Sequence, residues 1–553
     1  MERIQKIKYP IKQMLKDFWV FGKVRKKEIW FYISLVVIVA ALQQGPVYLS
    51  GKIIDFLTTG EYTYVWPSII TMIIMWVVLL GIDNYQKYHV YVLSKKIRNV
   101  ARVESFKRIF EVPMEHYDKN NSQDLIERVR FGTESLRVLV RVMLGTILKQ
   151  IFIIAFSLAI IISLDITAAM GIILFTIIFF FYVNKVSEKR VYLKNKAVKE
   201  KEKNNSQIIE YISNIKLVKT LFVAKPLIKK LSFGFDKVLE KDAFAQKYVR
   251  TNLFWQKAMI NLADVVMLGY LSFRVINHHI TIGEAVIIQG LFSRNSRSIK
   301  EIWTNLERLI EAKTGFYRLS KVFELKKEKQ SKFTPKLNGE LIFEDVWFQY
   351  PTRDKASLKG INLTILKGER LAVLGHSGSG KSTIAKLIAK LYTPQIGNIK
   401  LHKRNLKDYD LSQVLRIVPQ ENKLINASIA ENLRLVGEFS KEEIITALKQ
   451  ASAWSFISHL PLKEETIIGP GGIDLSGGQI QRICIARALI SRPKILILDE
   501  ATSNLDKNTE KEILQNLLKL PKDMTIMAIT HRVESIKGFD RKIILEEGRI
   551  IAN

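Results

Sequence analysis

The sequence has very little cysteine and is short of acidic residues. Its single cysteine, Cys484, excludes an internal disulfide, and it lies in an apolar helical run that favours a buried, inert thiol. The chain has 53 Asp and Glu against 85 Lys and Arg, which gives a formal net charge of +32. In a soluble protein this excess would favour nucleic-acid binding. With 553 residues the chain is too long for one core, so we expect two or more domains.

Repeats, low-complexity tracts and a signal peptide are also missing. The first apolar stretch is too long for the h-region of a signal peptide and lacks a small-residue cleavage site. Basic and apolar residues alternate from Ile4 to Val20, a pattern typical of a helix that lies in a membrane interface. We therefore expect an interfacial helix within residues 1–28.

The first 300 residues contain six apolar stretches of membrane-spanning length. They lie at about 29–50, 65–82, 138–163, 166–184, 254–276 and 281–299. Lys-rich segments, roughly 87–137 and 185–250, alternate with connections that hold almost no cations. This alternation follows the positive-inside rule and predicts a multi-pass protein of the cytoplasmic membrane with both termini in the cytoplasm. Much of the positive charge then faces an anionic membrane surface, so nucleic acid is not needed as a partner.

The second half of the sequence contains a phosphate-binding motif. The sequence GHSGSGKST, residues 375–383, follows an apolar, strand-like run and precedes a run with helical spacing. Glycines let consecutive N–H groups point at phosphate oxygens, Lys381 adds a positive charge, and the Ser382 hydroxyl suits Mg²⁺. The motif predicts contacts to ATP from Gly375, His376, Ser377, Gly378, Ser379, Gly380, Lys381, Ser382 and Thr383.

Two adjacent carboxylates follow the apolar run at 495–498. Asp499 is placed to hold Mg²⁺, and Glu500 to polarise a water for attack on the γ-phosphate. Further short β-rich runs at 341–348, 371–374, 525–529 and 542–545 alternate with helical patterns, which indicates an α/β nucleotide-binding domain.

The stretch Leu475-Ser476-Gly477-Gly478-Gln479 precedes a helical run, with Ser476 suited to cap it. These residues match the signature motif of ATP-binding-cassette proteins, and nearly the whole chain resembles an ABC exporter half-transporter of the lipid and multidrug exporter group. The resemblance implies an all-α transmembrane domain of six helices followed by an α/β P-loop cassette, in a multidomain membrane protein. It implies these domains: an interfacial helix at 1–28, the transmembrane domain with long cytoplasmic extensions and coupling helices at 29–324, a linker at 325–339 and the cassette at 340–553.

The resemblance also implies roles for single residues. Tyr350 stands where the family stacks an aromatic ring on adenine, Gln420 where a glutamine touches Mg²⁺, and His531 where a histidine contacts the γ-phosphate. Ser476, Gly477, Gly478, Gln479 and Asp506 fall in the signature and the D-loop, which join the nucleotide site. The catalytic pair is then Glu500 and His531, the metal ligands are Ser382, Gln420 and Asp499, and the cofactors are ATP and Mg²⁺.

Family members work as dimers, in which the P-loop of one cassette and the signature of the other enclose ATP. The resemblance therefore implies an ATP-hydrolysing translocase whose partner is a second half-transporter. Because every catalytic motif is intact, a homodimer is favoured, and a heterodimer stays an alternative. Two stretches, at 116–125 and 210–219, resemble coupling elements, but Gln123 replaces a usual Gly, and Pro470 replaces a usual Glu in the cassette segment that reads them.

The substrate is less defined by the sequence. Arg294, Arg297 and Lys300 lie in the sixth stretch, and Lys149 lies in the third. Intramembrane cations usually face a cavity or a partner, so these four predict a site for an anionic amphipath such as a lipid or glycolipid. The alternatives are neutralisation by acidic neighbours with snorkelling to the interface, a multidrug or peptide exporter, and an ATP-gated channel or sensor. No peptidase domain precedes the membrane half, so we do not expect a leader-cleaving peptide exporter.

Overall fold

The computed structural model describes residues 19, 21–119, 122–328, 331, 333, 339–469, 471–503, 505–531 and 537–552. The chain forms two compact units. The first contains residues 1–110 and 125–325, and the second contains residues 111–124 and 326–553. Most of the expected interfacial helix, much of the expected linker, Pro470 and the side chain of Gln123 lie outside the described residues.

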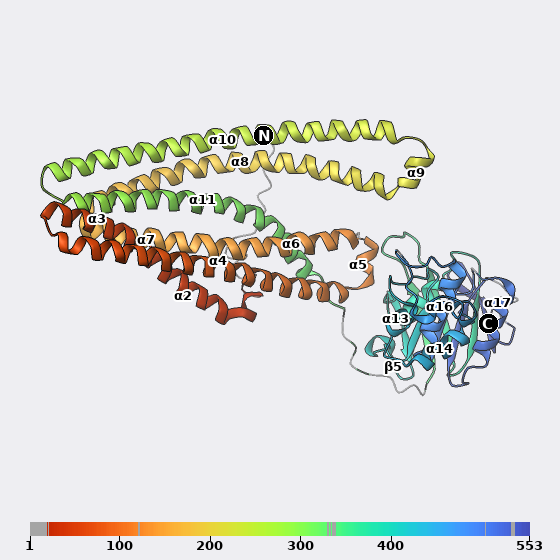
Figure 1. Ribbon diagram of the computed structural model, residues 1–553. Coiled ribbons are helices and arrows are strands. Elements are labelled where there is room, and N and C mark those ends of the chain that lie inside the picture. The colour runs from red at the N-terminus through yellow and green to blue at the C-terminus, as the bar shows by residue number, and fades with distance from the viewer. Residues whose placement is uncertain are drawn as a thin grey trace. The chain divides into compact units, whose positions relative to one another are not determined.

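The first unit is built from long helices that run side by side (Figure 1). In chain order its helical elements are η1 (Lys23–Arg25), α2 (Lys26–Leu42), α3 (Gly45–Thr59), η2 (Tyr62–Tyr64), α4 (Val65–Phe110), α6 (Ser122–Val142), the π-helical turn η3 (Met143–Ile147), α7 (Leu148–Leu164), α8 (Ile166–Ser213), α9 (Ile215–Thr220), α10 (Ala224–Ile276) and α11 (Ile282–Glu324). The 53 residues of α10 span about 80 Å at the rise of an α-helix, far more than a bilayer of about 30 Å. Long extensions beyond the membrane are therefore built into these helices.

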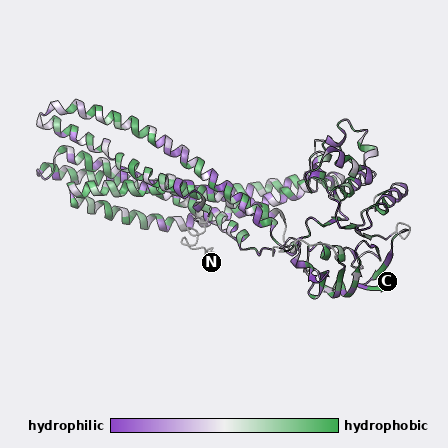
Figure 2. Ribbon diagram, turned by 90° about the horizontal axis from the view of Figure 1, so that it is seen from below, coloured by the Kyte–Doolittle hydropathy of each residue, from purple (hydrophilic) through white to green (hydrophobic). Residues whose placement is uncertain are grey.

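Five helical stretches in the described part of the chain are long and apolar enough to cross a membrane. They are Lys26–Thr59, Tyr62–Phe110, Asp124–Leu164, Ile166–Ser213 and Ala224–Ile276, and hydrophobic residues dominate long parts of them in Figure 2. They contain the first five predicted spans. The sixth predicted span lies in α11, which is helical but is not among these five stretches; Arg294, Asn295 and Arg297 lie within the predicted span and lower its apolar content.

The first predicted span is a broken helix that packs closely on α11. Gln43 and Gln44 separate α2 from α3, and Pro46, in the first turn of α3, lacks the N–H that a continuous helix needs. A Cβ added to Gly51 would lie 2.3 Å from the Gly283 carbonyl oxygen of α11, and one added to Gly283 would lie 2.2 Å from the Gly51 carbonyl oxygen. Only glycine at these two positions allows the backbones to approach so closely.

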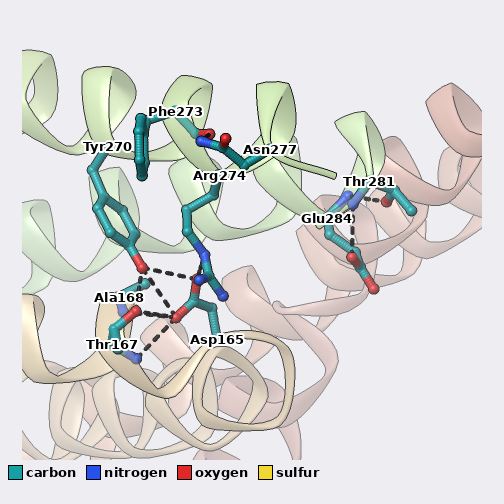
Figure 3. Close-up of polar contacts among 9 residues, drawn as sticks. All are labelled: Asp165, Thr167, Ala168, Tyr270, Phe273, Arg274, Asn277, Thr281 and Glu284. Carbon is teal, nitrogen blue, oxygen red and sulfur yellow. Dashed lines mark hydrogen bonds and ion pairs between the residues drawn. The ribbon is translucent and has the colours of Figure 1, made fainter. Parts of the chain in front are cut away.

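A buried carboxylate fixes the connection between α7 and α8 to the end of α10 (Figure 3). Asp165 caps α8 by accepting hydrogen bonds from the backbone N–H groups of Thr167 and Ala168 at 2.9 and 3.1 Å. Its other oxygen accepts from the Tyr270 hydroxyl at 3.0 Å and from Arg274 Nε at 3.1 Å. The bonds of Asp165 therefore join the α7–α8 connection to the C-terminal end of α10. Removing either Asp165 or Arg274 would leave the other charge without its partner, which is costly for a buried pair.

The second unit contains α5 (Met114–Lys119) and an α/β fold with two sheets. The strands are β1 (Leu341–Phe348), β2 (Leu358–Ile365), β3 (Arg370–Leu374), β4 (Ile396–Leu401), β5 (Arg404–Asn405), β6 (Leu415–Val418), β7 (Ile495–Asp499), β8 (Thr525–Ile529), β9 (Arg541–Glu546) and β10 (Arg549–Ala552). The four-stranded sheet, β2-β1-β4-β5, is antiparallel. In the six-stranded sheet, β10-β9-β3-β8-β7-β6, all strands except β10 are parallel.

Helices cover the parallel sheet and bring its functional ends together. They are α12 (Lys381–Ile388), η4 (Leu406–Asp408), α13 (Ile429–Arg434), α14 (Lys441–Gln450), α15 (Trp454–Ile457), η5 (Lys463–Glu465), α16 (Gly477–Leu489) and α17 (Lys507–Leu518). β7 and β8 are buried along their whole length, as expected for inner parallel strands. Cys484 is buried in α16, and burial raises the pKa of its thiol. Because parallel strands end at one edge, the residues after β3, β7 and β8 meet there.

Candidate nucleotide site

The loop after β3 has the backbone conformation of a phosphate cradle. Gly375, Gly378 and Gly380 have φ values of 148°, 82° and 107°, in the region that favours glycine. A Cβ on Gly380 would also lie 2.6 Å from the Ser357 carbonyl oxygen. The loop leads directly into α12, so its N–H groups and the positive helix end face the same point.

Lys381 is buried inside this loop. Its Nζ donates to the carbonyl oxygens of Gly375 and His376, both at 2.8 Å. Burial lowers the pKa of the Lys381 ammonium, while the nearby Glu500 and Asp499 raise it. The lysine is thus held by the loop itself and placed beside the two carboxylates.

Ser382 and Asp499 meet at the end of β7. The Ser382 hydroxyl donates to Asp499 Oδ1 at 2.8 Å. Burial raises the pKa of Asp499, and the hydrogen bond from Ser382 opposes this shift. A hydroxyl and a carboxylate side by side are oxygen ligands of the kind that Mg²⁺ takes together with phosphate oxygens, so the donor set fits this ion.

Glu500 is held in an unusual backbone conformation by three neighbours. Its φ is 50°, uncommon for a residue other than glycine. Its N–H donates to the Ile529 carbonyl of β8 at 3.0 Å, and its own carbonyl accepts from Gln481 Nε2 at 3.2 Å. Gln420 Nε2 donates to Glu500 Oε2 at 2.8 Å. A strained residue fixed in this way is typical of a functional position.

A cavity of about 450 Å³ joins these groups. Its lining residues are Asp118, Tyr350, Thr352, Arg353, Ser357, Ser377, Gly378, Gly380, Lys381, Ser382, Thr383, Lys386, Tyr392, Gln420 and Glu500. His531, exposed, lies two residues after β8, and β8 pairs with β7, which Glu500 follows. Of the predicted phosphate, metal and catalytic residues, Lys381, Ser382, Gln420 and Glu500 therefore line one cavity. Asp499 is bonded to Ser382 of that lining, and His531 follows the strand next to β7.

The signature residues do not line this cavity. Ser476 caps α16 in a reciprocal arrangement: its hydroxyl accepts from the Gln479 N–H at 3.3 Å, and its N–H donates to Gln479 Oε1 at 2.9 Å. Gly477 and Gly478 form the first turn of that helix. Asp506 similarly caps α17 by accepting from the Thr509 N–H at 3.0 Å. Within one chain, therefore, these five predicted ATP contacts lie apart from the P-loop cavity.

The four cations predicted for the substrate do not share one environment. Lys149 Nζ pairs with Asp83 Oδ1 at 2.5 Å, and its side chain is only 12% exposed. The Arg294 guanidinium donates to the Gln43 carbonyl, at the break between α2 and α3. Arg297 is exposed and donates from Nε to the Ser293 carbonyl of its own helix at 3.2 Å, and Lys300 is half-buried.

Several residues of this site were not predicted from the sequence, among them Thr352, Arg353, Ser357 and Lys386 of the cavity lining. Gln481 supports Glu500 from inside α16, and Tyr392 and Asp118 line the cavity. The segment around Asp118 was assigned only to coupling. No spacing rule links a residue near position 118 to one near 392, so only the fold could place them together.

The fold and the site define a helical membrane protein fused to a P-loop ATPase domain. A family model for the ABC transporter transmembrane region matches residues 29–298, and one for the ABC transporter matches residues 358–503. The ATP-dependent lipid A-core flippase of Pseudoalteromonas translucida (strain TAC 125) is 30% identical over 509 residues, 87% of this chain and 84% of that protein. The chain belongs to the ABC transporter family.

Other relatives have different names. The alpha-hemolysin translocation ATP-binding protein of Escherichia coli is 30% identical over 508 residues, 87% of this chain and 68% of that protein. A solved structure of a bacterial Atm1-family ABC exporter with ATP bound is 22% identical, with a TM-score of 0.85 over 96% of this chain and 95% of that one. The predicted class is confirmed: the chain is an ABC-type ATPase coupled to export.

Proposed function

We propose that the cavity binds Mg²⁺ and ATP and that Glu500 is the general base of hydrolysis. The observation that carries this proposal is the contact pair Ser382–Asp499 and Gln420–Glu500 beside Lys381. Ser382, Asp499 and the Gln420 amide oxygen would hold the metal, which neutralises phosphate charge when bound. The Glu500 carboxylate takes a proton from the attacking water, and His531 contacts the γ-phosphate from the end of β8.

We further propose a homodimer in the cytoplasmic membrane with both termini in the cytoplasm. Two observations support the dimer: the signature residues at the start of α16 lie outside the P-loop cavity of their own chain, and every catalytic residue is of the active type. A second copy can supply the signature that each cavity lacks. The orientation rests on the concentration of Lys and Arg in the predicted cytoplasmic segments.

For the substrate, we propose an anionic amphipath such as a phospholipid or glycolipid. Arg297 and Lys300 carry this proposal, because no ion pair of either is found in the described part of the chain. Arg294 and Lys149 already have the partners given above, so we assign them mainly structural roles. The relative named as a lipid A-core flippase supports a lipid substrate.

A second candidate is a polypeptide. The Escherichia coli relative, named for alpha-hemolysin translocation, has the same identity to this chain as the flippase relative. A long polypeptide does not need a cationic site within the bilayer, so the role of Arg297 distinguishes the two candidates.

The substrate is tested by ATPase stimulation in nanodiscs that contain phosphatidylglycerol or phosphatidylcholine alone. We expect the wild type to be stimulated more by the anionic lipid, and Arg297→Ala and Lys300→Ala to lose most of that difference. Lys230→Ala, which removes an exposed cation of α10 outside the predicted span, is the matched control. If both variants respond to phosphatidylglycerol as the wild type does, the cations are structural and a polypeptide becomes the better candidate.

A further inference from the structure

An aromatic cluster, two members of which line the nucleotide cavity, lies in the second unit. Phe348 and Tyr350, at the end of β1, meet Tyr392, which follows α12. The Tyr350 and Tyr392 ring centroids are 5.2 Å apart, and both rings lie within 5.5 Å of Phe348. Phe348 and Tyr392 are 1% and 6% exposed. In such a close-packed cluster, Tyr350 cannot change position without displacing Tyr392.

Tyr350 is also in contact with the phosphate end of the cavity. Its hydroxyl lies 3.3 Å from the Thr383 hydroxyl of α12. The cationic groups of Lys386 and Arg353 lie 5.4 and 5.3 Å from the centre of its ring. Cations are attracted to the face of an aromatic ring, so a base that stacks on Tyr350 has to displace them or rearrange the ring.

Tyr392 connects this cluster to α5. Its hydroxyl donates to Asp118 Oδ2 at 2.7 Å, a short bond to a charged acceptor. Burial and the neighbouring Asp118 both raise the pKa of Tyr392, so the phenol keeps its proton and stays a donor. Asp118 belongs to α5, and in the sequence α5 is the link between α4 and α6, two helices of the first unit.

We propose that Tyr392 and Asp118 are positioning residues that report the presence of a base on Tyr350 to α5. The inference rests on the proposed function, because it takes Tyr350 as the adenine-binding ring. It adds a route from the adenine side of the cavity to the helix that joins α4 and α6. On the phosphate side, Thr383 reaches this cluster through the Tyr350 hydroxyl, whereas the described bonds of Lys381, Ser382 and Gln420 go to other residues.

The test compares a ligand that has the base with one that has only phosphates. The full chain in nanodiscs of phosphatidylethanolamine and phosphatidylglycerol is saturated with Mg²⁺-ADP or with Mg²⁺-pyrophosphate, at about 100 times each variant's own Kd, so that occupancy is equal. Hydrogen exchange of peptides containing α5 is the readout. In the wild type we expect ADP to slow exchange and pyrophosphate to have little effect.

Two variants remove the link in different ways. Tyr392→Phe keeps the ring and deletes the hydroxyl that donates the hydrogen bond. Asp118→Asn replaces the charged acceptor, on the exposed side of the bond, by a neutral amide. Tyr392→Phe loses a hydrogen bond to a charged group, which shifts an equilibrium by about tenfold or more, so the ADP effect on α5 should fall by that factor. Asp118→Asn keeps an acceptor oxygen but removes its charge, so the ADP effect should fall there too, by a smaller factor. Tyr409→Phe, a half-buried tyrosine of the same domain, and Glu115→Gln, which removes a charge from α5, should behave as the wild type.

The outcomes separate this inference from the proposed function. If ADP binds to both variants and slows exchange in α5 as in the wild type, the link is refuted. Equal slowing by pyrophosphate in the wild type also refutes it, because the phosphate side is then the source of the signal. If the wild type binds no ADP, the proposed function itself fails. Should Tyr392→Phe not fold, Asp118→Asn alone decides between these results.

Discussion

At the residue scale, the site depends on side chains that fix other side chains. The motif Asp499-Glu500 was predicted to supply a metal ligand and a base, but a pair of adjacent carboxylates does not specify where each points. In the structure the two carboxylates have different partners: Asp499 accepts from Ser382, and Glu500, with a left-handed backbone, accepts from Gln420. Gln481 and Ile529 hold that backbone, while Gln420 holds the carboxylate. The position of Glu500 therefore depends on its own segment and on three others, which contain Gln420, Gln481 and Ile529.

Replacing Glu500 with Gln should abolish hydrolysis without preventing ATP binding. The amide has the same shape but cannot accept the proton of the attacking water, and loss of a general base typically costs about 10²–10⁴-fold in rate. The turnover number and, separately, the ATP Kd from calorimetry measure the two effects. Glu438→Gln, in an exposed loop, is the control for an equal change of charge. Turnover near the wild-type value in Glu500→Gln would remove Glu500 from its proposed role.

At the scale of whole helices, the membrane part is organised around α11. This helix was predicted as the sixth span, and its polar residues make it the least apolar of the six. Several of these residues contact neighbouring helices: Glu301 accepts from Gln150 of α7 at 2.5 Å, and Ser293 donates to Asp264 of α10 at 2.8 Å. A helix that is buried among others can carry polar groups that a lipid-exposed helix cannot. The position of α11 in the bundle explains its composition.

Replacing Gly51 with Ala should lower the stability of the membrane part. The added Cβ would lie 2.3 Å from the Gly283 carbonyl oxygen, so α3 and α11 would have to separate. Overpacking of this kind costs about 1–3 kcal/mol, and the apparent midpoint of thermal unfolding in detergent should fall. Gly269→Ala in α10 is the control, because its Cβ would meet no atom within 4 Å. Equal midpoints for the two variants would show that the close contact of α3 with α11 does not matter for stability.

At the scale of the whole molecule, one chain does not bring the residues that we predict to contact ATP into a single cavity. The P-loop and Glu500 line one cavity, and Asp499 is bonded to Ser382 of that lining, whereas Ser476 and Asp506 cap helices elsewhere in the unit. The family resemblance implied this division, because its members share each ATP between two cassettes. The division is the reason why we propose a dimer.

Purified alone, the chain should form a dimer that hydrolyses ATP. Light scattering in detergent gives the mass, and ATPase assays with mixed wild-type and Glu500→Gln chains show whether both sites work. In a homodimer with two active sites, activity should fall as the variant fraction rises. The Lys381→Ala chain, which is expected to lose ATP binding, is the inactive control. An inactive monomer that regains activity with a second cassette protein would favour the heterodimer instead.

Some of these features follow from the sequence alone. The apolar lengths, the alternation of basic segments and the motifs at 375–383, 475–479 and 499–500 determined the fold class and the ABC transporter family, and both are confirmed. These signals are local: a span needs about 20 apolar residues, and a P-loop is one short segment. Local patterns can be read without knowing what lies next to them in space.

The tertiary structure decided which long-range partners each group has. Lys149, predicted to join a substrate site, is paired with Asp83, and Arg294 bonds to the carbonyl of Gln43. Tyr392 and Asp118, which no motif joins, share a hydrogen bond beside the nucleotide cavity. An ion pair or a buried hydrogen bond depends on distances of a few ångströms between segments far apart in the chain. The sequence determined which chemical groups the protein has, and the folded chain determined which of them are already bound to one another.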